Sequence, residues 1–168
     1  MHTHKTSKIY QFDVHILSVI VWTVGIIIGI YAGSFISTPL STAIYRSCSV
    51  RNTYFVPAAI VPLALTFLAA RYSLQGMIYP ILFFKAFFDG VILLALSHCF
   101  GSASWLMGVP ALFADRASTA ILLYYSVRCL EDRTYRALFW FLAFLFVTIC
   151  LLLLDHYIIS DILILWMR

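Results

Sequence analysis

The stretch from Val14 to Ile36, VHILSVIVWTVGIIIGIYAGSFI, decides the fold that we expect for this chain. It contains no Asp, Glu, Lys or Arg. As a helix rising about 1.5 Å per residue, it is long enough to cross roughly 30 Å of hydrocarbon. A secretory signal would have a shorter apolar core of about 7–15 residues and a small-residue cleavage site. The stretch therefore predicts an uncleaved transmembrane helix.

Four further apolar stretches follow, at about 54–70, 76–98, 105–127 and 137–157. Hydrophobic residues make up 63% of the chain and charged residues 11%, whereas soluble domains hold about 45–50% and about 25%. A small water-soluble globule could not bury that excess. We therefore predict an all-α fold, with residues 1–168 forming a single integral membrane domain. Its architecture would be a polytopic transmembrane bundle of about five helices.

The basic residues between the apolar stretches predict the orientation, because cytoplasmic connectors of membrane proteins carry an excess of Lys and Arg. They also account for the net charge of +4, so no nucleic acid partner is expected. With five spans, one side receives Lys5, Lys8, Arg71, Arg128, Arg133 and Arg136, and the other receives Arg46, Arg51 and Arg168. We expect a multi-pass protein of the cell membrane, with the N-terminus cytoplasmic and the C-terminus outside.

Gly25, Gly29 and Gly33 form two overlapping GxxxG steps in the first stretch. Glycines four residues apart lie on one face of a helix and let another helix approach closely. They predict a helix-packing strip, although glycine is also common in membrane helices without such a role. The partner would be another helix of this chain, a second copy or a different membrane protein.

Lys85 and Asp89 in the third stretch, and Asp115 and Arg116 in the fourth, form a predicted intramembrane charge cluster. Each such residue costs about 2.5–3.5 kcal/mol at the centre of a membrane, so the charges must be paired. The two helices are joined by a short turn and should be antiparallel neighbours. We predict crossed pairs, Lys85 with Asp115 and Asp89 with Arg116. The cluster would serve either as a structural clamp or as a path for a solute or a proton.

Gly108 and Pro110 precede Asp115 by one to two helical turns. Proline removes a backbone hydrogen bond, so these residues predict a helix break. Broken helices beside charges in the membrane form binding sites in transporters. Proline kinks also occur in passive bundles.

Catalytic and metal-binding patterns are not found, so we expect no enzyme, no catalytic residue, no metal and no cofactor. Asp155 and His156, with Asp161 six residues on, do not converge on one helix face. His98 and Cys99 are adjacent and would diverge on a helix, which argues against a thiol nucleophile with its base. The four cysteines show no CxxC spacing, so neither a disulfide framework nor a zinc site is expected.

Two motifs carry a resemblance to a known family. The first is Phe83-Phe84-Lys85-Ala86-Phe87-Phe88-Asp89-Gly90, an aromatic-flanked lysine with a glycine downstream, and the second is the turn Phe100-Gly101-Ser102-Ala103-Ser104-Trp105-Leu106. The region from about 76 to 128 resembles small membrane proteins of spore-forming bacteria, which are similar in turn to the stage II sporulation protein M family. The resemblance implies a helical membrane scaffold that recruits partners acting on the cell wall and has no catalytic site.

These observations leave two main functional classes. The first is a non-enzymatic membrane scaffold or subunit of a membrane complex, whose partners would be the lipid bilayer and a membrane protein or a second copy. The alternative is a transport component, such as the substrate-binding membrane subunit of a vitamin, ion or other small-solute uptake system. An enzyme acting on lipid is a third class, for which no motif is present.

Overall fold

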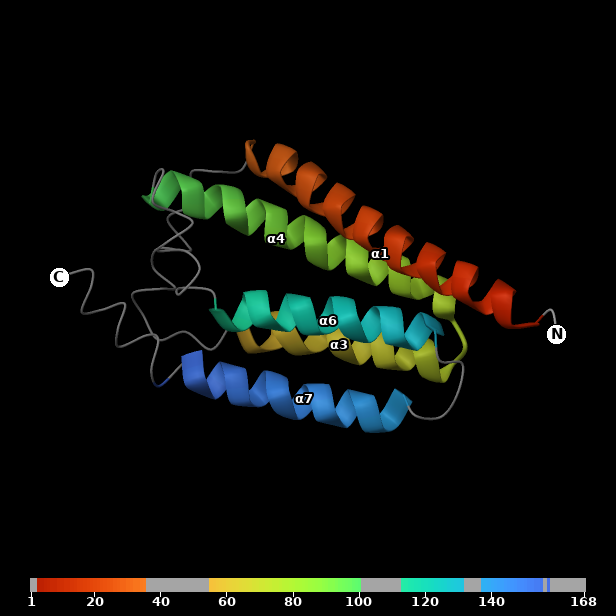
Figure 1. The fold of residues 1–168 in the computed structure, drawn as a ribbon. Coiled ribbons are helices and arrows are strands. Elements are labelled where there is room, and N and C mark those ends of the chain that lie inside the picture. Colours follow the sequence, from red (N-terminus) through yellow and green to blue (C-terminus); the bar gives the residue numbers. More distant parts are fainter. Residues whose placement is uncertain (1–2, 36–54, 101–112, 132–136, 156, 158–168) are drawn as a thin grey trace.

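The computed structural model describes residues 3–35, 55–100, 113–131, 137–155 and 157. This part of the chain consists of helices and the turns between them, with no strand, which confirms the predicted all-α class. Its elements are α1 (Thr3–Gly33), α3 (Phe55–Arg71), the 3-10 turn η1 (Gln75–Met77), α4 (Ile78–Phe100), α6 (Phe113–Glu131) and α7 (Ala137–Leu154) (Figure 1).

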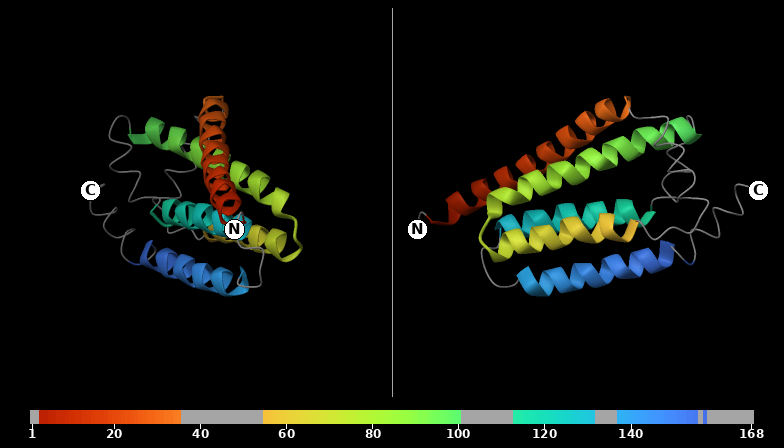
Figure 2. Two further views of the ribbon diagram at one scale, coloured as in Figure 1. Left: turned by 45° about the vertical axis from the view of Figure 1, so that its right-hand side comes forward. Right: turned by 180° about the vertical axis from the view of Figure 1, so that it is seen from behind.

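The helices alternate in direction along the bundle and lie in layers. α1 and α4 pack along each other in one outer layer, α3 and α6 form the middle, and α7 covers the far side (Figures 1 and 2). Because successive helices run in opposite directions, α1, α4 and α7 point one way along the bundle, and α3 and α6 point the other way (Figure 1). α4 packs against α1 and also against α3 and α6 of the middle layer, and α1 contacts α6 as well.

The apolar core lies where the middle layer meets α7 and the start of α4. Its fully buried members include Leu63 on α3, Ile78 on α4, and Leu122 and Tyr125 on α6. Aromatic rings of α7 close the core from the far side, as in the stacked pair Phe67–Phe141 with ring centroids 4.4 Å apart. Because this packing fixes α6 against α3 and α7, the remaining face of α6 is presented to α4.

The limits of α6 correct one prediction. Arg128 to Arg133 lie between the apolar stretches at about 105–127 and 137–157, a position that predicts a connector. In the structure, however, the helix continues through Arg128 to Glu131. Cys129 and Leu130 are buried there, and Arg128 pairs with Glu131 one turn on, at 3.6 Å. Burial and the i,i+3 ion pair both favour helix over an exposed connector. The predicted start of this span, residues 105–112, lies outside the described residues.

The turn after α3 ends the helix with a residue in the left-handed region, Ser73 at φ 58°. The Leu74 N–H donates to the Ala69 carbonyl at 2.8 Å, and the Ser73 N–H donates to the Ala70 carbonyl at 3.2 Å. This is the hydrogen-bond pattern of a Schellman motif, whose left-handed position is usually glycine. The motif turns the chain toward η1 and α4.

Two described segments are long and apolar enough to cross a membrane: Val14–Gly33, with mean hydropathy 2.2, and Gln75–Ala95, with mean hydropathy 1.8. Ala59–Arg71 and Leu138–Leu154 are apolar but shorter. A core helix of a soluble protein can meet the same criteria of length and composition. The described residues therefore form a helical fold in which two helices are candidate membrane spans.

Candidate functional site

The position of α4 is set by the glycines of α1. A Cβ added to Gly25 would lie 2.8 Å from both the Ala86 Cβ and the Phe83 carbonyl oxygen, and one added to Gly29 would collide with the Phe87 carbonyl. At Gly33 the nearest atoms, on Val91 and Leu94, would be 3.3 Å away. The structure thus places the glycine strip against α4 of the same chain, with the two backbones in contact.

α4 contributes a glycine of its own to this contact. A Cβ on Gly90 would collide with the Ile26 carbonyl oxygen of α1, and Ala86 is fully buried one turn earlier. Sequence analysis did not single out Gly90 as a packing residue. The signal was present, because Ala86 and Gly90 form a small-xxx-small pair in an apolar helix.

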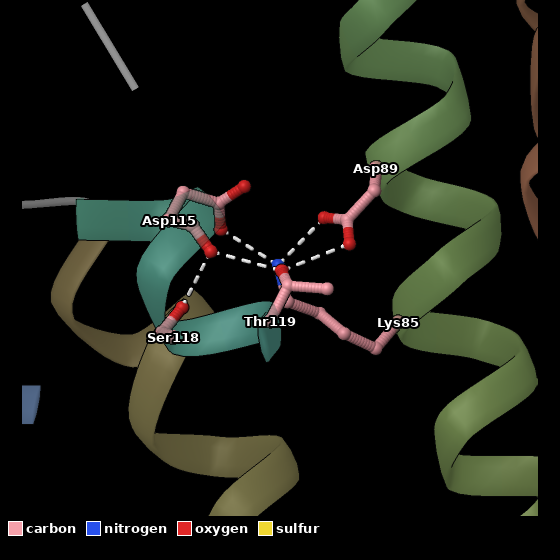
Figure 3. A network of polar contacts seen from close by, with 5 residues as sticks. All are labelled: Lys85, Asp89, Asp115, Ser118 and Thr119. Atoms are coloured by element: carbon pink, nitrogen blue, oxygen red, sulfur yellow. Dashed lines mark hydrogen bonds and ion pairs between the residues drawn. The ribbon is translucent and has the colours of Figure 1, made fainter. Parts of the chain in front are cut away.

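The face of α4 that carries Ala86 and Gly90 packs against α1. The adjacent face of α4 is turned toward α6. Lys85 and Asp89 lie one turn apart on that second face, as expected for an i,i+4 pair. The Lys85 Nζ donates to Asp89 Oδ1 at 2.7 Å and to Asp115 Oδ1 at 2.6 Å (Figure 3). One ammonium group therefore joins two carboxyl groups from different helices.

A threonine of α6 completes the contact. Thr119 Oγ1 lies 2.9 Å from Asp89 Oδ2 and 2.9 Å from the Asp115 carbonyl oxygen, so its single proton serves one acceptor at a time. Ser118 Oγ also donates to that carbonyl, at 2.8 Å. The Asp115 carbonyl thus keeps a partner when Thr119 donates to Asp89. We refer to Lys85, Asp89, Asp115 and Thr119 together as the charge cluster.

The charge cluster is closed to the surroundings. Lys85 is 7% exposed, Asp89 0% and Asp115 3%. The second oxygen of Asp115, Oδ2, is buried and has no hydrogen-bond partner among the described residues. If both carboxyl groups were ionised, the cluster would carry one net negative charge out of contact with solvent.

One of the two predicted pairs is present and the other is wrong. Lys85 and Asp115 are together, but Asp89 bonds to Lys85 and Thr119 instead of Arg116. Adjacent residues on a helix point about 100° apart. Because Asp115 takes the face toward α4, Arg116 is directed elsewhere. Its Nη2 is buried without a hydrogen-bond partner, and no ion pair joins it to either aspartate among the described residues.

Thr119 was missed by sequence analysis, although it lies four residues after Asp115 and so shares its helix face. Asp115 is predicted in the middle of its span, and the part of that span before residue 113 lies outside the described residues. Gly108 and Pro110, the predicted helix break, lie outside the described residues, as do His156 and Asp161.

A second polar contact lies near the other end of α6. His15 Nε2 of α1 is 2.6 Å from Glu131 Oε1. The Arg128 guanidinium lies 5.6 Å from the centre of the Trp140 ring on α7. Within the described residues, no group of three or more His, Cys, Asp or Glu side chains is arranged to hold a metal ion.

In comparisons with known proteins, the chain matches no family, no curated protein and no solved structure. The resemblance to the stage II sporulation protein M family stays a prediction. The charge cluster and the α1–α4 contact are therefore the observations from which a function must be argued.

Proposed function

We propose that the chain is a five-span protein of the cell membrane that acts as a non-enzymatic scaffold or as a subunit of a membrane complex. The membrane part of the proposal is supported by the outer faces of the helices. Large apolar side chains there are more than half exposed, among them Ile27 on α1, Phe84 and Phe88 on α4, and Phe139 and Phe146 on α7. Exposing many large apolar side chains is unfavourable in water and suits lipid.

The alternating helix directions support the predicted orientation. Arg71 at the end of α3 and Arg128 near the end of α6 lie at the end of the bundle where α1 begins. Lys5 and Lys8 belong to the first turns of α1. Concentrating these basic residues at one end favours that end as cytoplasmic.

The scaffold role is argued from the closed charge cluster. The Lys85 ammonium touches both carboxyl groups directly, and all three side chains are buried. A contact of this kind fixes the register of α4 on α6. The glycine contact fixes α4 on α1 at the same time. Since the glycine strip is occupied within the chain, a partner or a second copy would have to use another face.

Replacing the cluster with apolar side chains tests the scaffold role. The variant Lys85→Met/Asp89→Leu/Asp115→Leu removes all three charges, so none is left stranded in the bundle. A scaffold needs only the packed helices. Cells in which this variant replaces the chromosomal copy should therefore show the same phenotype as cells that carry the parent protein. Correct folding together with loss of that phenotype would reject the scaffold role.

The transport alternative is favoured by one observation: within the described ranges, the buried Asp115 Oδ2 has no hydrogen-bond partner. A carrier keeps an unbalanced charge for its solute more readily than a purely structural contact does. In this case the same triple variant should fold, reach the membrane and lack activity. The two functions thus predict opposite results in one experiment.

A further inference from the structure

The charge cluster brings one cationic group into contact with two carboxyl groups. Each aspartate has one oxygen on Lys85 Nζ, at 2.7 Å and 2.6 Å. Asp89 Oδ2 accepts a hydrogen bond from Thr119, a neutral donor. Asp115 Oδ2 accepts none from the part of the chain that the structure describes, and Figure 3 shows it turned away from the lysine nitrogen.

Among the described side chains of the surrounding helices, none supplies the missing positive charge. Arg116 is partly buried and makes no ion pair with Asp89 or Asp115 among the described residues. On α1, where the side chains of residues 14–35 are described, His15 pairs with Glu131. That pair is 16 residues from Asp115 along α6, about 24 Å. On α3, the charged residue among the described side chains is Arg71, at the opposite end of the bundle from the start of α6.

An uncompensated carboxylate in a closed interior is costly, and such a group takes up a proton instead of remaining charged. Two carboxyl groups held at one site share the first proton as a pair, so the proton belongs to both. We propose that the charge cluster is a proton-binding site, in which Asp89 and Asp115 together hold one proton beside Lys85 at neutral pH. Proton binding makes the buried cluster electrically neutral. The inference concerns the interior of the bundle and does not rest on the scaffold role.

Infrared spectroscopy of the folded full-length protein, with carbon-13 in its aspartate side chains, tests the site directly. A protonated carboxyl group gives a C=O stretching band that an ionised one lacks, and the label assigns this band to aspartate. The parent protein should show the band at neutral pH and lose it at strongly alkaline pH. Its absence at neutral pH in the folded parent protein would overturn the proposal, whatever the variants do.

Single substitutions then assign the band to the cluster. Asp89→Asn and Asp115→Asn each leave one carboxylate for Lys85, a balanced pair that needs no proton, so each should lose the band. Arg116→Gln, a control that changes the neighbouring charge, should retain it. A band that survives in either asparagine variant, or disappears in Arg116→Gln, would contradict the charge balance argued above.

A metal cation such as Na⁺ is the competing occupant. In that case the parent protein would lack the band at neutral pH. Added NaCl would raise its melting temperature relative to choline chloride, and Asp115→Asn would abolish the effect. Under the proton proposal the two salts should give equal melting temperatures.

Discussion

Lys85 Nζ lies 2.6 Å from Asp115 Oδ1, and this contact joins α4 to α6 across 30 positions of the sequence. The same nitrogen lies 2.7 Å from Asp89 Oδ1. Lys85 is thus shared between a partner on its own helix and a partner on the neighbouring one. The consequences of removing Lys85 and of removing either aspartate should therefore differ.

We predict that Lys85→Met destabilises the protein more than Asp115→Asn. The first change strands two buried carboxyl groups, and removing one partner of a buried ion pair costs roughly 3–5 kcal/mol. The second leaves Lys85 with Asp89 as a balanced pair and should cost less. Thermal unfolding in detergent compares the two variants. The triple apolar variant should recover most of the loss seen in Lys85→Met. Equal melting temperatures for Lys85→Met and the parent would show that the lysine is not buried against the carboxyl groups.

Thr119 should contribute through its hydrogen bond to Asp89. Thr119→Val keeps the shape of the side chain but removes the donor, and a hydrogen bond to a charged group is worth about 1.5–3 kcal/mol. Ser118→Ala is the matched control, because Ser118 Oγ donates to a backbone carbonyl one turn earlier in α6. Its loss should cost less in the same unfolding assay. A larger loss for Ser118→Ala would mean that Thr119 donates mainly to the Asp115 carbonyl.

Gly29→Leu should disrupt the contact between α1 and α4 strongly, whereas Ile28→Leu should be nearly neutral. At Gly29 even a Cβ meets the backbone of Phe87, which cannot move aside as a flexible side chain would. Overpacking of this kind costs about 1–3 kcal/mol or more. Ile28 is 43% exposed, on the outer side of α1, and exchanges one apolar side chain for another. The difference in melting temperature measures the effect, and equal shifts would contradict the backbone contact.

Particular residues show what the sequence could and could not predict. The apolar stretches were sufficient to predict the helical class. The GxxxG spacing was sufficient to predict which face of α1 packs against another helix. Both predictions depend only on local periodicity. The partner of Lys85 in α6 followed from antiparallel neighbours at similar depth. The direction in which Arg116 points could not be predicted in this way. The rotation of α6 about its axis is set by packing of Leu122 and Tyr125 against α3 and α7. That tertiary constraint has no local sequence signal.

Ser73→Gly should stabilise the turn between α3 and η1. Ser73 adopts φ 58°, a conformation that costs an L-residue roughly 1–2 kcal/mol and glycine little. Its side chain is exposed, so few contacts are lost. We expect a gain of about 1 kcal/mol in the free energy of unfolding. Ser73→Ala is the control, since alanine also has a Cβ and should give no comparable gain. A gain of the same size from alanine would exclude the left-handed backbone as its cause.

The orientation can be tested with two residues that the structure places at opposite ends of the bundle. Tyr72 follows the end of α3 and is 71% exposed, and Phe35 follows the end of α1 and is 76% exposed. Each is replaced by cysteine in a version in which all four native cysteines are changed to alanine, and intact cells are treated with a membrane-impermeant maleimide.

The basic residues at the Tyr72 end predict that this end is cytoplasmic. Phe35→Cys should therefore be labelled in intact cells, and Tyr72→Cys only after the membrane is permeabilised. Because the two side chains have nearly equal exposure, a difference in labelling reports the side of the membrane and not burial in the protein. The reverse pattern would invert the orientation. Labelling of both positions in intact cells would show that α1 and α3 do not end on opposite sides of a membrane, and the five-span proposal would fail.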